Sequence, residues 1–484
     1  MYNAGTLPHT LDISRRITSR ASKGLSSSSL GLLCAIAFAP RAAAGPPLAA
    51  GHASPAEVTA RRAAVLSALG KAGEDAFLLL RAPPERNFAA DVDYPYRPSN
   101  DLYYLTGLSE PRCALLLASK EIGRSGKAIL FIDPPPPHHR VWIGDGLTRE
   151  RAAEASGIPL DSVHELHELP GLMREAAPAR RAHPRAPAET PVVYFEEESS
   201  FGPGEGPSEP YSFLMRSLGS SAFHLRLRPP SELTHPLRQV KSAAEVRLIE
   251  GAVRATVRAL EESSRVIRPG AREQDIRAVI EGAFLSEGCD GWSFPPIVAS
   301  GPNTCVLHYP GYGRRIEEGD LVLLDIGAEK GFYAADVTRT MPASGKFSAR
   351  QRAVYEAVLR AQEAAIAVVR PGAAFSEVNA TARREIAKAL PGLGLAADGE
   401  NPGKYLPHGT SHGVGLAVHD PMPERLLAPG MVIAVEPGIY IPDEALGVRI
   451  EDNVLVTEDG ARVLSSGAPK TVEGIEAWMR EREF

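Results

Sequence analysis

The sequence predicts a mixed α/β protein of two or three domains, and three observations lead to this fold class. First, 484 residues exceed the size at which one hydrophobic core keeps growing. Second, residues 58–232 alternate between helix-like and strand-like segments. Third, the second half repeats one helix-pair plan at a spacing of about a hundred residues. The net charge of -6 argues against a nucleic-acid-binding surface, which would need an excess of basic residues.

The first 45 residues differ from the rest of the chain. Basic residues between 15 and 23 precede an apolar stretch, Leu30–Ala39, and then the small residues Ala42–Ala44. This order is typical of a secretory signal with cleavage near Ala44, and the apolar stretch is too short to span a bilayer. An organelle transit peptide and a disordered tail are the alternatives. We expect residues 1–50 to form a separate segment and the protein to be exported, or otherwise cytoplasmic.

Residues 51–232 are predicted to form the first folded domain. Apolar residues at helical spacing between Ala63 and Leu69 lead into an apolar run at Ala76–Leu80, and a second run follows at Ala114–Leu117. Alternating segments of this kind indicate a sheet with helices on its faces. Pro229–Pro230 ends the region, so the next domain is expected to cover residues 233–484.

The second domain is predicted to contain two related halves. Ser242 and Glu245 form a capping box in front of the first helix. Helical spacing of apolar residues predicts two helix pairs, at Val246–Leu260 with Ile276–Phe284 and at Val354–Val368 with Phe375–Ile386. Both first helices end at an Arg-Pro-Gly sequence, and strand-like segments follow both pairs. Two such halves facing each other would enclose one cleft, the preferred place for a site.

Each half contributes a pair of acids in strand-like sequence. Asp325 lies in the apolar segment Leu321–Gly327, and Asp336 lies in Tyr333–Thr340. A hairpin folded about Lys330 and Gly331 would place the two carboxylates directly opposite each other, with Cβ atoms about 4.5–5.5 Å apart.

The second acid pair comes from two later segments. Glu436 ends the apolar run that starts at Met431, and Glu451 follows Gly447. A turn centred on Asp443 and Glu444 would place these two acids opposite each other. Carboxylates in buried strands are costly without counter-charges, so four of them predict two metal ions.

Histidines occur close to these acids in the sequence. His408-Gly-Thr-Ser-His412 and His419-Asp420 form a Gly-rich segment that predicts a strand or a loop. It is not the helical His-Glu-x-x-His of a zincin, because no Glu follows His408. His308 follows another apolar run. Together with four acids in strand centres, these histidines favour a metal site.

The same segments resemble aminopeptidase P, a member of the pita-bread metallopeptidase family to which prolidase and methionine aminopeptidase also belong. The motifs are Leu324-Asp-Ile-Gly, Ala335-Asp-Val-Thr-Arg-Thr, His408-Gly-x-Ser-His-x-x-Gly-x-x-Val-His-Asp, Val435-Glu-Pro-Gly-Ile-Tyr and Val448-Arg-Ile-Glu-Asp-Asn. Tyr94–Gly107, with Glu110-Pro111, resembles the family's N-terminal domain, and the likeness runs from about residue 58 to 470. It implies an aminopeptidase P-type (creatinase-type) α/β domain followed by a pseudo-twofold pita-bread catalytic domain.

The resemblance also assigns roles to individual residues. It implies five metal ligands, Asp325, Asp336, His412, Glu436 and Glu451. Asp336 and Glu451 would bridge the two ions, and His308 and His419 would hydrogen-bond the substrate carbonyl and its tetrahedral intermediate. Arg449 would take part in catalysis, and His408 and Tyr440 in substrate binding. Tyr103 falls where some relatives have a tryptophan that reaches a neighbouring subunit.

The implied activity is removal of an N-terminal residue that precedes proline. Two divalent cations can activate a shared water, and Glu436 would accept its proton and pass it to the prolyl nitrogen. Oxygen-rich ligation suits Mn(II) best, with Co(II) and Zn(II) as alternatives. The expected partners are peptides with proline at the second position, without nucleic acid or a membrane span. The resemblance also implies a homo-oligomer, a dimer or a tetramer.

Three alternatives remain open at this stage. Prolidase uses the same metal ligands but cuts dipeptides, and must bind the substrate carboxylate with an extra cation, for which Arg97 and Arg449 are candidates. A non-catalytic pita-bread binding module would have lost some of the acids. A creatinase-like enzyme, which hydrolyses a C–N bond without metal, would also lack this complete set.

Overall fold

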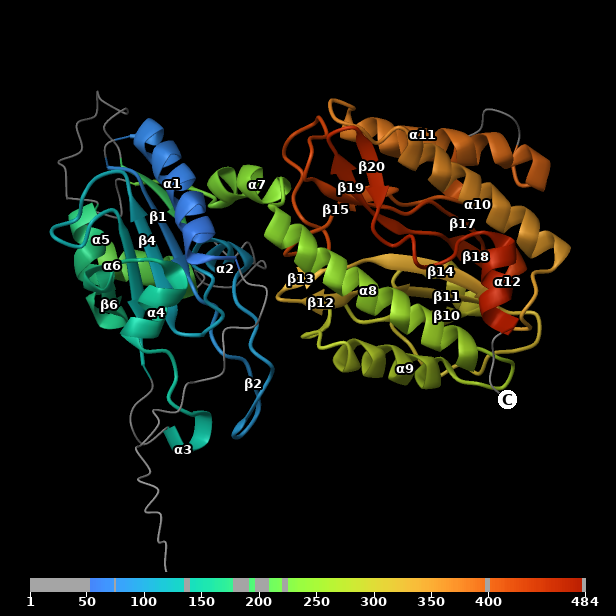
Figure 1. Cartoon of the computed structure of the whole chain (residues 1–484), viewed down its shortest axis with the longest axis horizontal. Coiled ribbons are helices and arrows are strands. Elements are labelled where there is room, and N and C mark those ends of the chain that lie inside the picture. Colours follow the sequence, from blue (N-terminus) through green and yellow to red (C-terminus); the bar gives the residue numbers. More distant parts are fainter. Residues whose placement is uncertain are drawn as a thin grey trace, which may run out of the picture. The chain divides into compact units, whose positions relative to one another are not determined.

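The N-terminal half is built around a six-stranded mixed sheet (Figure 1). The computed structural model describes residues 53–73, 75–134, 140–176, 191–195, 209–219, 225–396 and 401–480. In the order β6-β5-β4-β1-β7-β8, the strands are Val163–Glu165, Ala128–Ile132, Cys113–Ala118, Phe77–Arg81, Val192–Phe195 and Arg226–Arg228. The two apolar runs singled out in the sequence form β1 and β4, which pair antiparallel at the centre of the sheet. The predicted alternation of helices and strands is confirmed.

Helices cover both faces of this sheet. They are α1 (Pro55–Ala72), α2 (Asn100–Thr106), α4 (Arg149–Ser156), α5 (Leu169–Ala176) and α6 (Glu209–Leu218). On β1, Leu78 and Leu80 share a core with residues of α1, α2 and α4. Phe77 and Leu79 point to the other face and share a core with α5 and α6. This period-two division is the pattern expected of a strand buried on both sides. A short hairpin, β2 (Asn87–Ala89) and β3 (Val92–Asp93), and the one-turn α3 (Arg140–Ile143) complete this half.

A buried charge cluster connects α2 with the C-terminal half. Arg238, on α7 (Ser231–Gln239), donates to Asp101 Oδ1 at 2.8 Å and to Asp420 Oδ1 at 2.5 Å. Lys241 donates to the other oxygen of Asp420 at 3.1 Å. Asp420 directly follows His419, so the cluster supports the Gly-rich segment that carries the predicted site histidines.

Both predicted helix pairs are present in the C-terminal half. They are α8 (Ala243–Val266) with α9 (Glu273–Ser286), and α10 (Ala349–Ala367) with α11 (Phe375–Ala389). The capping box at Ser242 starts α8, because its hydroxyl accepts from Glu245 N while the Glu245 carboxylate accepts from Ser242 N. The first helix of each pair packs against its partner and against strands of the central sheets.

The strands that follow each helix pair form four small antiparallel sheets (Figure 1). The first two are β10-β11-β14 (Ile297–Ser300, Leu321–Ile326, Val337–Pro342) and β13-β12-β9 (Tyr333–Ala334, Ala328–Lys330, Gly291–Trp292). The other two are β15-β16-β19-β20 (Ser411–Gly413, Val432–Val435, Asp452–Thr457, Gly460–Val463) and β17-β18 (Gly438–Ile441, Leu446–Arg449). Helix α12 (Val472–Arg480) ends the described chain. The repeated plan of a helix pair followed by strands is therefore confirmed.

Two predictions remain untested by the structure. The signal-like residues 15–44 lie outside the described residues. Residues 45–484 belong to one compact unit, so the domain boundary expected between 232 and 233 stays a prediction. No helix in the described parts of the chain is both long and apolar enough to cross a membrane.

Candidate metal centre

The first acid pair does not have the register predicted for it. Asp325 pairs with Thr338, not with Asp336. The turn is centred on Gly331 and Phe332, whose φ angles of 56° and 65° are both left-handed, as a two-residue hairpin turn requires. Moving the centre of the turn by one residue moves the residue that pairs with Asp325 by two, from Asp336 to Thr338. Asp336 keeps its face, because the side-chain period of a strand is also two, and lies diagonally across from Asp325.

The backbone beside Asp336 approaches Gly327 closely. A Cβ atom on Gly327 would lie 1.8 Å from the carbonyl oxygen of Ala335 and 2.4 Å from Ser293 Oγ. The predicted continuous second strand is divided here, because Ala335 and Asp336 separate β13 from β14. The amide of Asp336 donates to Asn453 Oδ1 at 3.0 Å, which ties the first half to the second.

The second acid pair has the predicted register. Val435 pairs with Asp452 and Gly438 pairs with Arg449, so Glu436 lies opposite Glu451 between them. The 3-10 turn Pro442–Glu444 joins the two strands, as the predicted turn centre requires. The carboxylate of Glu451 is also oriented by Thr338, whose hydroxyl donates to Oε2 at 2.8 Å.

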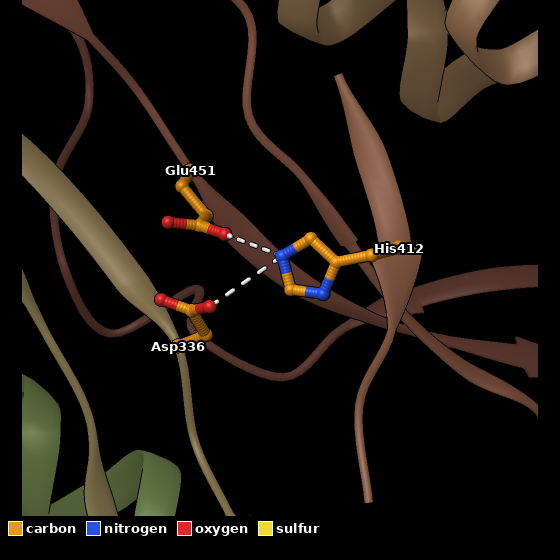
Figure 2. Close-up of side chains that lie close together, drawn as sticks. All are labelled: Asp336, His412 and Glu451. Carbon is orange, nitrogen blue, oxygen red and sulfur yellow. Dashed lines mark ion pairs between the residues drawn. The ribbon is translucent and has the colours of Figure 1, made fainter. Parts of the chain in front are cut away.

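His412 brings the two acid pairs together (Figure 2). Its Nε2 lies 3.5 Å from Asp336 Oδ2, 3.5 Å from Glu436 Oε1 and 3.7 Å from Glu451 Oε1. Asp336, His412 and Glu451 each offer a ligand atom, and these atoms lie within 4.8 Å of one another. His412 is on β15, as the predicted strand or loop allows, and no helix carries this segment.

Three buried carboxylate oxygens at this place have no hydrogen-bond partner among the described residues: Asp325 Oδ1, Asp336 Oδ1 and Glu451 Oε1. Buried polar atoms are nearly always paired, because leaving one unpaired costs free energy. One of the three oxygens, Glu451 Oε1, lies 3.7 Å from His412 Nε2, and all three acids share a cavity with that histidine. Such a set fits the needs of divalent cations, which bind carboxylate oxygens and histidine. The residues therefore suit a metal centre.

Electrostatics lead to the same conclusion. Burial raises the pKa of Asp336 well above its ordinary value, and the charges of Glu451 and Asp325 raise it further. Burial and the charge of Glu451 raise the pKa of Glu436 to about 8. For His412, the nearby carboxylates outweigh burial and raise the pKa to about 9. Without cations, this cluster holds protons in their place.

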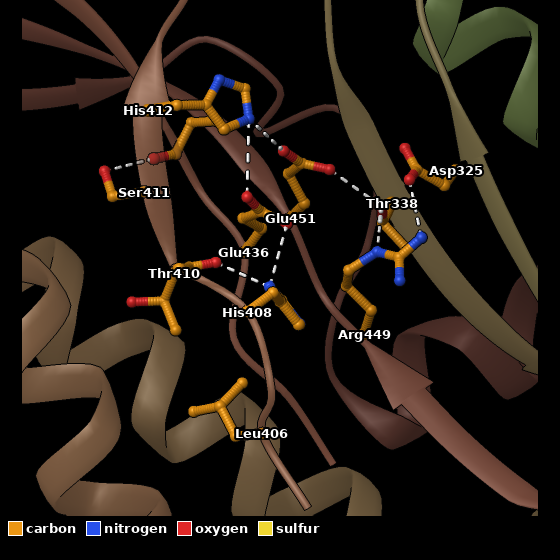
Figure 3. Close-up of polar contacts among 12 residues, drawn as sticks. Asp325, Thr338, Leu406, His408, Thr410, Ser411, His412, Glu436, Arg449 and Glu451 are labelled. Carbon is orange, nitrogen blue, oxygen red and sulfur yellow. Dashed lines mark hydrogen bonds and ion pairs between the residues drawn. The ribbon is translucent and has the colours of Figure 1, made fainter. Parts of the chain in front are cut away.

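A second polar chain leads away from the acids, and Figure 3 shows its first contact, between Asp325 and Arg449. Arg449 donates through Nη2 to Asp325 Oδ2 at 2.6 Å and through Nη1 to the hydroxyl of Tyr440 at 2.9 Å. That hydroxyl lies 2.9 Å from His408 Nε2. Burial, together with the charge of Arg449, lowers the pKa of His408 to about 4, so its imidazole is neutral near pH 7.

One cavity of about 700 Å³ is lined by all the predicted site residues except Tyr440. The hydroxyl of Tyr440 contacts two of the lining residues, His408 and Arg449. His419 lies in the cavity with its ring edge-on to that of His412, at 4.3 Å between centroids. His308 lines the cavity from a different segment and is exposed. Apolar side chains cover another part of the wall: Phe294, Pro295, Ile297, Leu307 and Tyr312.

Two residues of the N-terminal half lie away from this cavity. Tyr103 is buried, its ring stacks edge-on against Phe332, and its hydroxyl donates to Gly331 O at 3.3 Å. Tyr103, which falls where some relatives have a tryptophan that reaches a neighbouring subunit, packs within its own chain. Arg97 binds Glu329 Oε2 at 2.8 Å and Leu416 O at 2.8 Å, and does not line the cavity.

Sequence reasoning missed Thr338. Its hydroxyl accepts from Arg449 Nε at 3.3 Å while it donates to Glu451, so it joins the acid cluster to the second polar chain. The signal was available, because Thr338 follows Asp336 by two residues and so lies on the same face of the strand. Asn453, which accepts from the Asp336 amide, carried no such signal.

The fold and the cluster together define a metal-dependent hydrolase of the pita-bread class. A family model described as Metallopeptidase family M24 matches residues 247–458, and one described as Aminopeptidase P, N-terminal domain, matches residues 58–183. The chain belongs to metallopeptidase family M24 and, within it, to the aminopeptidase P group. The family and fold predicted from the sequence are confirmed, and divalent metal ions belong to this family's chemistry.

Curated relatives and solved structures agree with this assignment. The chain is 33% identical over 426 residues to the Xaa-Pro aminopeptidase of Haemophilus influenzae, covering 83% of this chain and 93% of that protein. It is 33% identical over 432 residues to Xaa-Pro aminopeptidase 3 of Homo sapiens, covering 84% and 82%. The structure of Pseudomonas aeruginosa aminopeptidase P is similar with a TM-score of 0.79 and 31% identity, covering 89% of this chain and 99% of that chain.

Proposed function

We propose that the protein is an Xaa-Pro aminopeptidase that hydrolyses the bond between an N-terminal residue and proline. Two divalent cations would be held by Asp325, Asp336, His412, Glu436 and Glu451, with Asp336 and Glu451 shared between them. The observation that carries the proposal is one cavity that holds three acids with unpaired buried oxygens together with His412, whose Nε2 lies 3.5 Å from Asp336 Oδ2 and 3.7 Å from Glu451 Oε1. When bound, such cations supply an activated water and neutralise developing negative charge.

The side chains around the cluster have complementary tasks. Glu436 is the least buried of the four acids and lines the cavity, so it is placed to accept a proton from water and return it to the prolyl nitrogen. Burial lowers the pKa of His419, which therefore reaches the carbonyl as a neutral donor. His308, which lines the cavity from the segment after β10, would also donate a hydrogen bond to the substrate carbonyl. Arg449 holds Asp325 in place and carries positive charge to the edge of the cluster.

The charge of the cavity favours an aminopeptidase over a dipeptidase. Arg449 is the single lysine or arginine among the described residues that line it. Both of its terminal nitrogens are already engaged, by Asp325 and Tyr440. Arg97, the other candidate, binds Glu329 instead. A dipeptide brings its carboxylate next to proline and needs a free cation there, so we propose substrates of three residues or more. The prolidase reading remains the alternative.

Three finer points are also proposals. Four carboxylates and one histidine suit Mn(II) best, with Co(II) and Zn(II) as substitutes. A dimer or tetramer is in accord with the exposed apolar side chains of Phe88 and Trp142, which are 65% and 80% exposed. Export rests on the signal-like order of residues 15–44 alone. A non-catalytic module is disfavoured, because all five ligand residues stand.

Peptide cleavage tests the proposal directly. The chain from residue 45 onward would be stripped with a chelator, reloaded with Mn(II), and given Xaa-Pro-Yaa tripeptides and Xaa-Pro dipeptides. Tripeptide cleavage that depends on metal, with slow dipeptide cleavage, is expected. Asp336→Asn should abolish activity and lower the bound metal, whereas Asp443→Asn, in the exposed turn after β17, should change neither. Faster dipeptide cleavage would establish prolidase, and a chain that binds no metal would refute the site.

A further inference from the structure

Glu273 is a fully buried acid outside the metal cluster, at the first position of α9. Its carboxylate accepts five hydrogen bonds, all from one later segment. Oε1 accepts from Ser300 N at 3.0 Å, Ser300 Oγ at 2.8 Å and Asn303 Nδ2 at 3.0 Å, and Oε2 accepts from the Tyr309 hydroxyl at 3.1 Å and Arg314 N at 3.2 Å. A buried carboxylate without partners is costly, so this one depends on the segment as much as the segment depends on it.

The tethered segment is residues 300–314, which carries His308. The bonds lie on both sides of this histidine, because Asn303 precedes it and Tyr309 and Arg314 follow it. His308 itself is exposed and has no hydrogen-bond partner among the described residues, so its own side chain does not fix its place. The segment around it must do so, and Glu273 bonds to this segment on both sides, to Ser300 and Asn303 before His308 and to Tyr309 and Arg314 after it.

The segment also forms part of the cavity wall. His308 and Tyr309 line the cavity that holds the acid cluster, whereas Glu273 does not. Glu273 therefore has no direct contact with a substrate there and can act on the reaction through the residues that it holds. Reacting groups displaced by about 1 Å can lose on the order of a hundredfold in rate, so tethering of this kind matters for catalysis.

We propose that Glu273 is a positioning residue that holds His308 in place for peptide hydrolysis. The inference rests on the proposed function, because it gives His308 its role at the substrate carbonyl. Glutamine at this position would keep the shape but would place an amide N–H₂ where one carboxylate oxygen now accepts. The hydrogen bonds to either Oε1 or Oε2 would therefore be lost.

A double-mutant cycle tests the inference. Glu273→Gln, His308→Ala and the double variant would be compared with wild type on an Xaa-Pro-Yaa tripeptide, with Glu281→Gln on the same helix as the matched control. Among the described residues, Glu281 pairs only with Arg277, and both side chains are partly exposed. Glu273→Gln should lower kcat about tenfold or more with a smaller change in KM, and should have less than a twofold effect when His308 is already alanine. Equal effects in both backgrounds, or unchanged kcat in Glu273→Gln, would overturn it.

Two further measurements keep the inference testable on its own. Tyr309→Phe removes one bond next to His308 and leaves the other four, so it should fold if Glu273→Gln does not. It should show a smaller loss of kcat, about threefold, that also vanishes in the His308→Ala background. The imidazole NMR signal of His308 in the Zn(II)-loaded protein, assigned by its loss in His308→Ala, should move in Glu273→Gln and not in Glu281→Gln. An unmoved signal refutes positioning even if the tripeptide proves the wrong substrate, whereas a wild type that cleaves no tripeptide refutes only the proposed function.

Discussion

Removing the divalent cations should make the protein lose stability as pH rises from 6.5 to 8. In the metal-free protein, burial and Glu451 raise the pKa of Glu436 to about 8, and burial also raises the pKa of Asp336. Nearby carboxylates raise the pKa of His412 to about 9. Unfolded carboxyl and imidazole groups titrate near about 4.3 and 6.5, so all three groups bind protons more tightly when the chain is folded.

The sign of the effect follows from these directions. A group whose pKa is higher in the folded state stabilises folding at low pH, and this contribution is lost as pH rises from the unfolded to the folded pKa. The window ends near 8 for Glu436 and near 9 for His412. His408 has the opposite sign, because its pKa is lowered to about 4, but its contribution is complete above about pH 6.5. Between pH 6.5 and 8, the change in stability therefore reports on the acids and the histidine of the metal cluster and not on His408.

The expected magnitude is a few kcal/mol. Each proton that is bound in the folded chain but not in the unfolded chain lowers the free energy of unfolding by about 1.4 kcal/mol for every unit by which the pH rises. A protonated His412 favours ionised carboxylates beside it, so we expect one or two protons to be held rather than three. The metal-free protein should then lose about 2–4 kcal/mol between pH 6.5 and 8.

Urea unfolding, followed by circular dichroism in excess EDTA or saturating Mn(II), measures this loss. The metal-loaded protein should show no such fall, because bound cations take the place of the protons. Glu436→Gln removes one titrating carboxyl and should reduce the slope in EDTA, whereas the exposed Asp443→Asn should leave it unchanged. Stability in EDTA that stays flat or rises over this window would refute the electrostatic account of the cluster.

Three further substitutions probe the framework around the site. Arg339→Met should cost about 3–5 kcal/mol in urea unfolding, because it leaves the fully buried Asp452 without the arginine that binds it at 2.7 Å; a cost below about 1 kcal/mol would contradict this. Gly327→Ala should leave little soluble folded protein, as size-exclusion chromatography would show, since its Cβ would lie 1.8 Å from Ala335 O. Tyr440→Phe should lower kcat and the free energy of unfolding (the latter by about 1–2 kcal/mol) without loss of bound metal, and unchanged kinetics would show that its hydroxyl does not contribute to turnover.

Short-range patterns predicted most of the secondary structure. Apolar spacing located both helix pairs, and the capping box at Ser242 marked the first residue of α8 correctly. The register of Glu436 opposite Glu451 was also predictable, because the strands on both sides of the turn at 442–445 keep one register. Where the chain folds back on itself nearby, counting residues is enough.

Two kinds of feature were not predictable in this way. Phe332 adopts a left-handed conformation that a phenylalanine rarely takes, so nothing local indicated that the first turn is centred one residue later. Contacts between distant segments, such as Arg449 with Asp325 or Glu273 with Tyr309, depend on how whole elements pack. Local sequence periodicity carries no record of such packing.

The arginine between Asp101 and Asp420 has a consequence for how this enzyme can vary. Arg238 is almost fully enclosed, and it joins a carboxylate of the N-terminal half to the one that follows His419. A fragment beginning near residue 233 would lack Asp101, so we expect Arg238, and with it the segment that carries His419, to be held less firmly than in the whole chain. Residue 101 is distant in sequence from the predicted metal ligands. Substitutions near it should nevertheless change the rate of turnover, because Asp101 is connected through Arg238 to Asp420, next to His419.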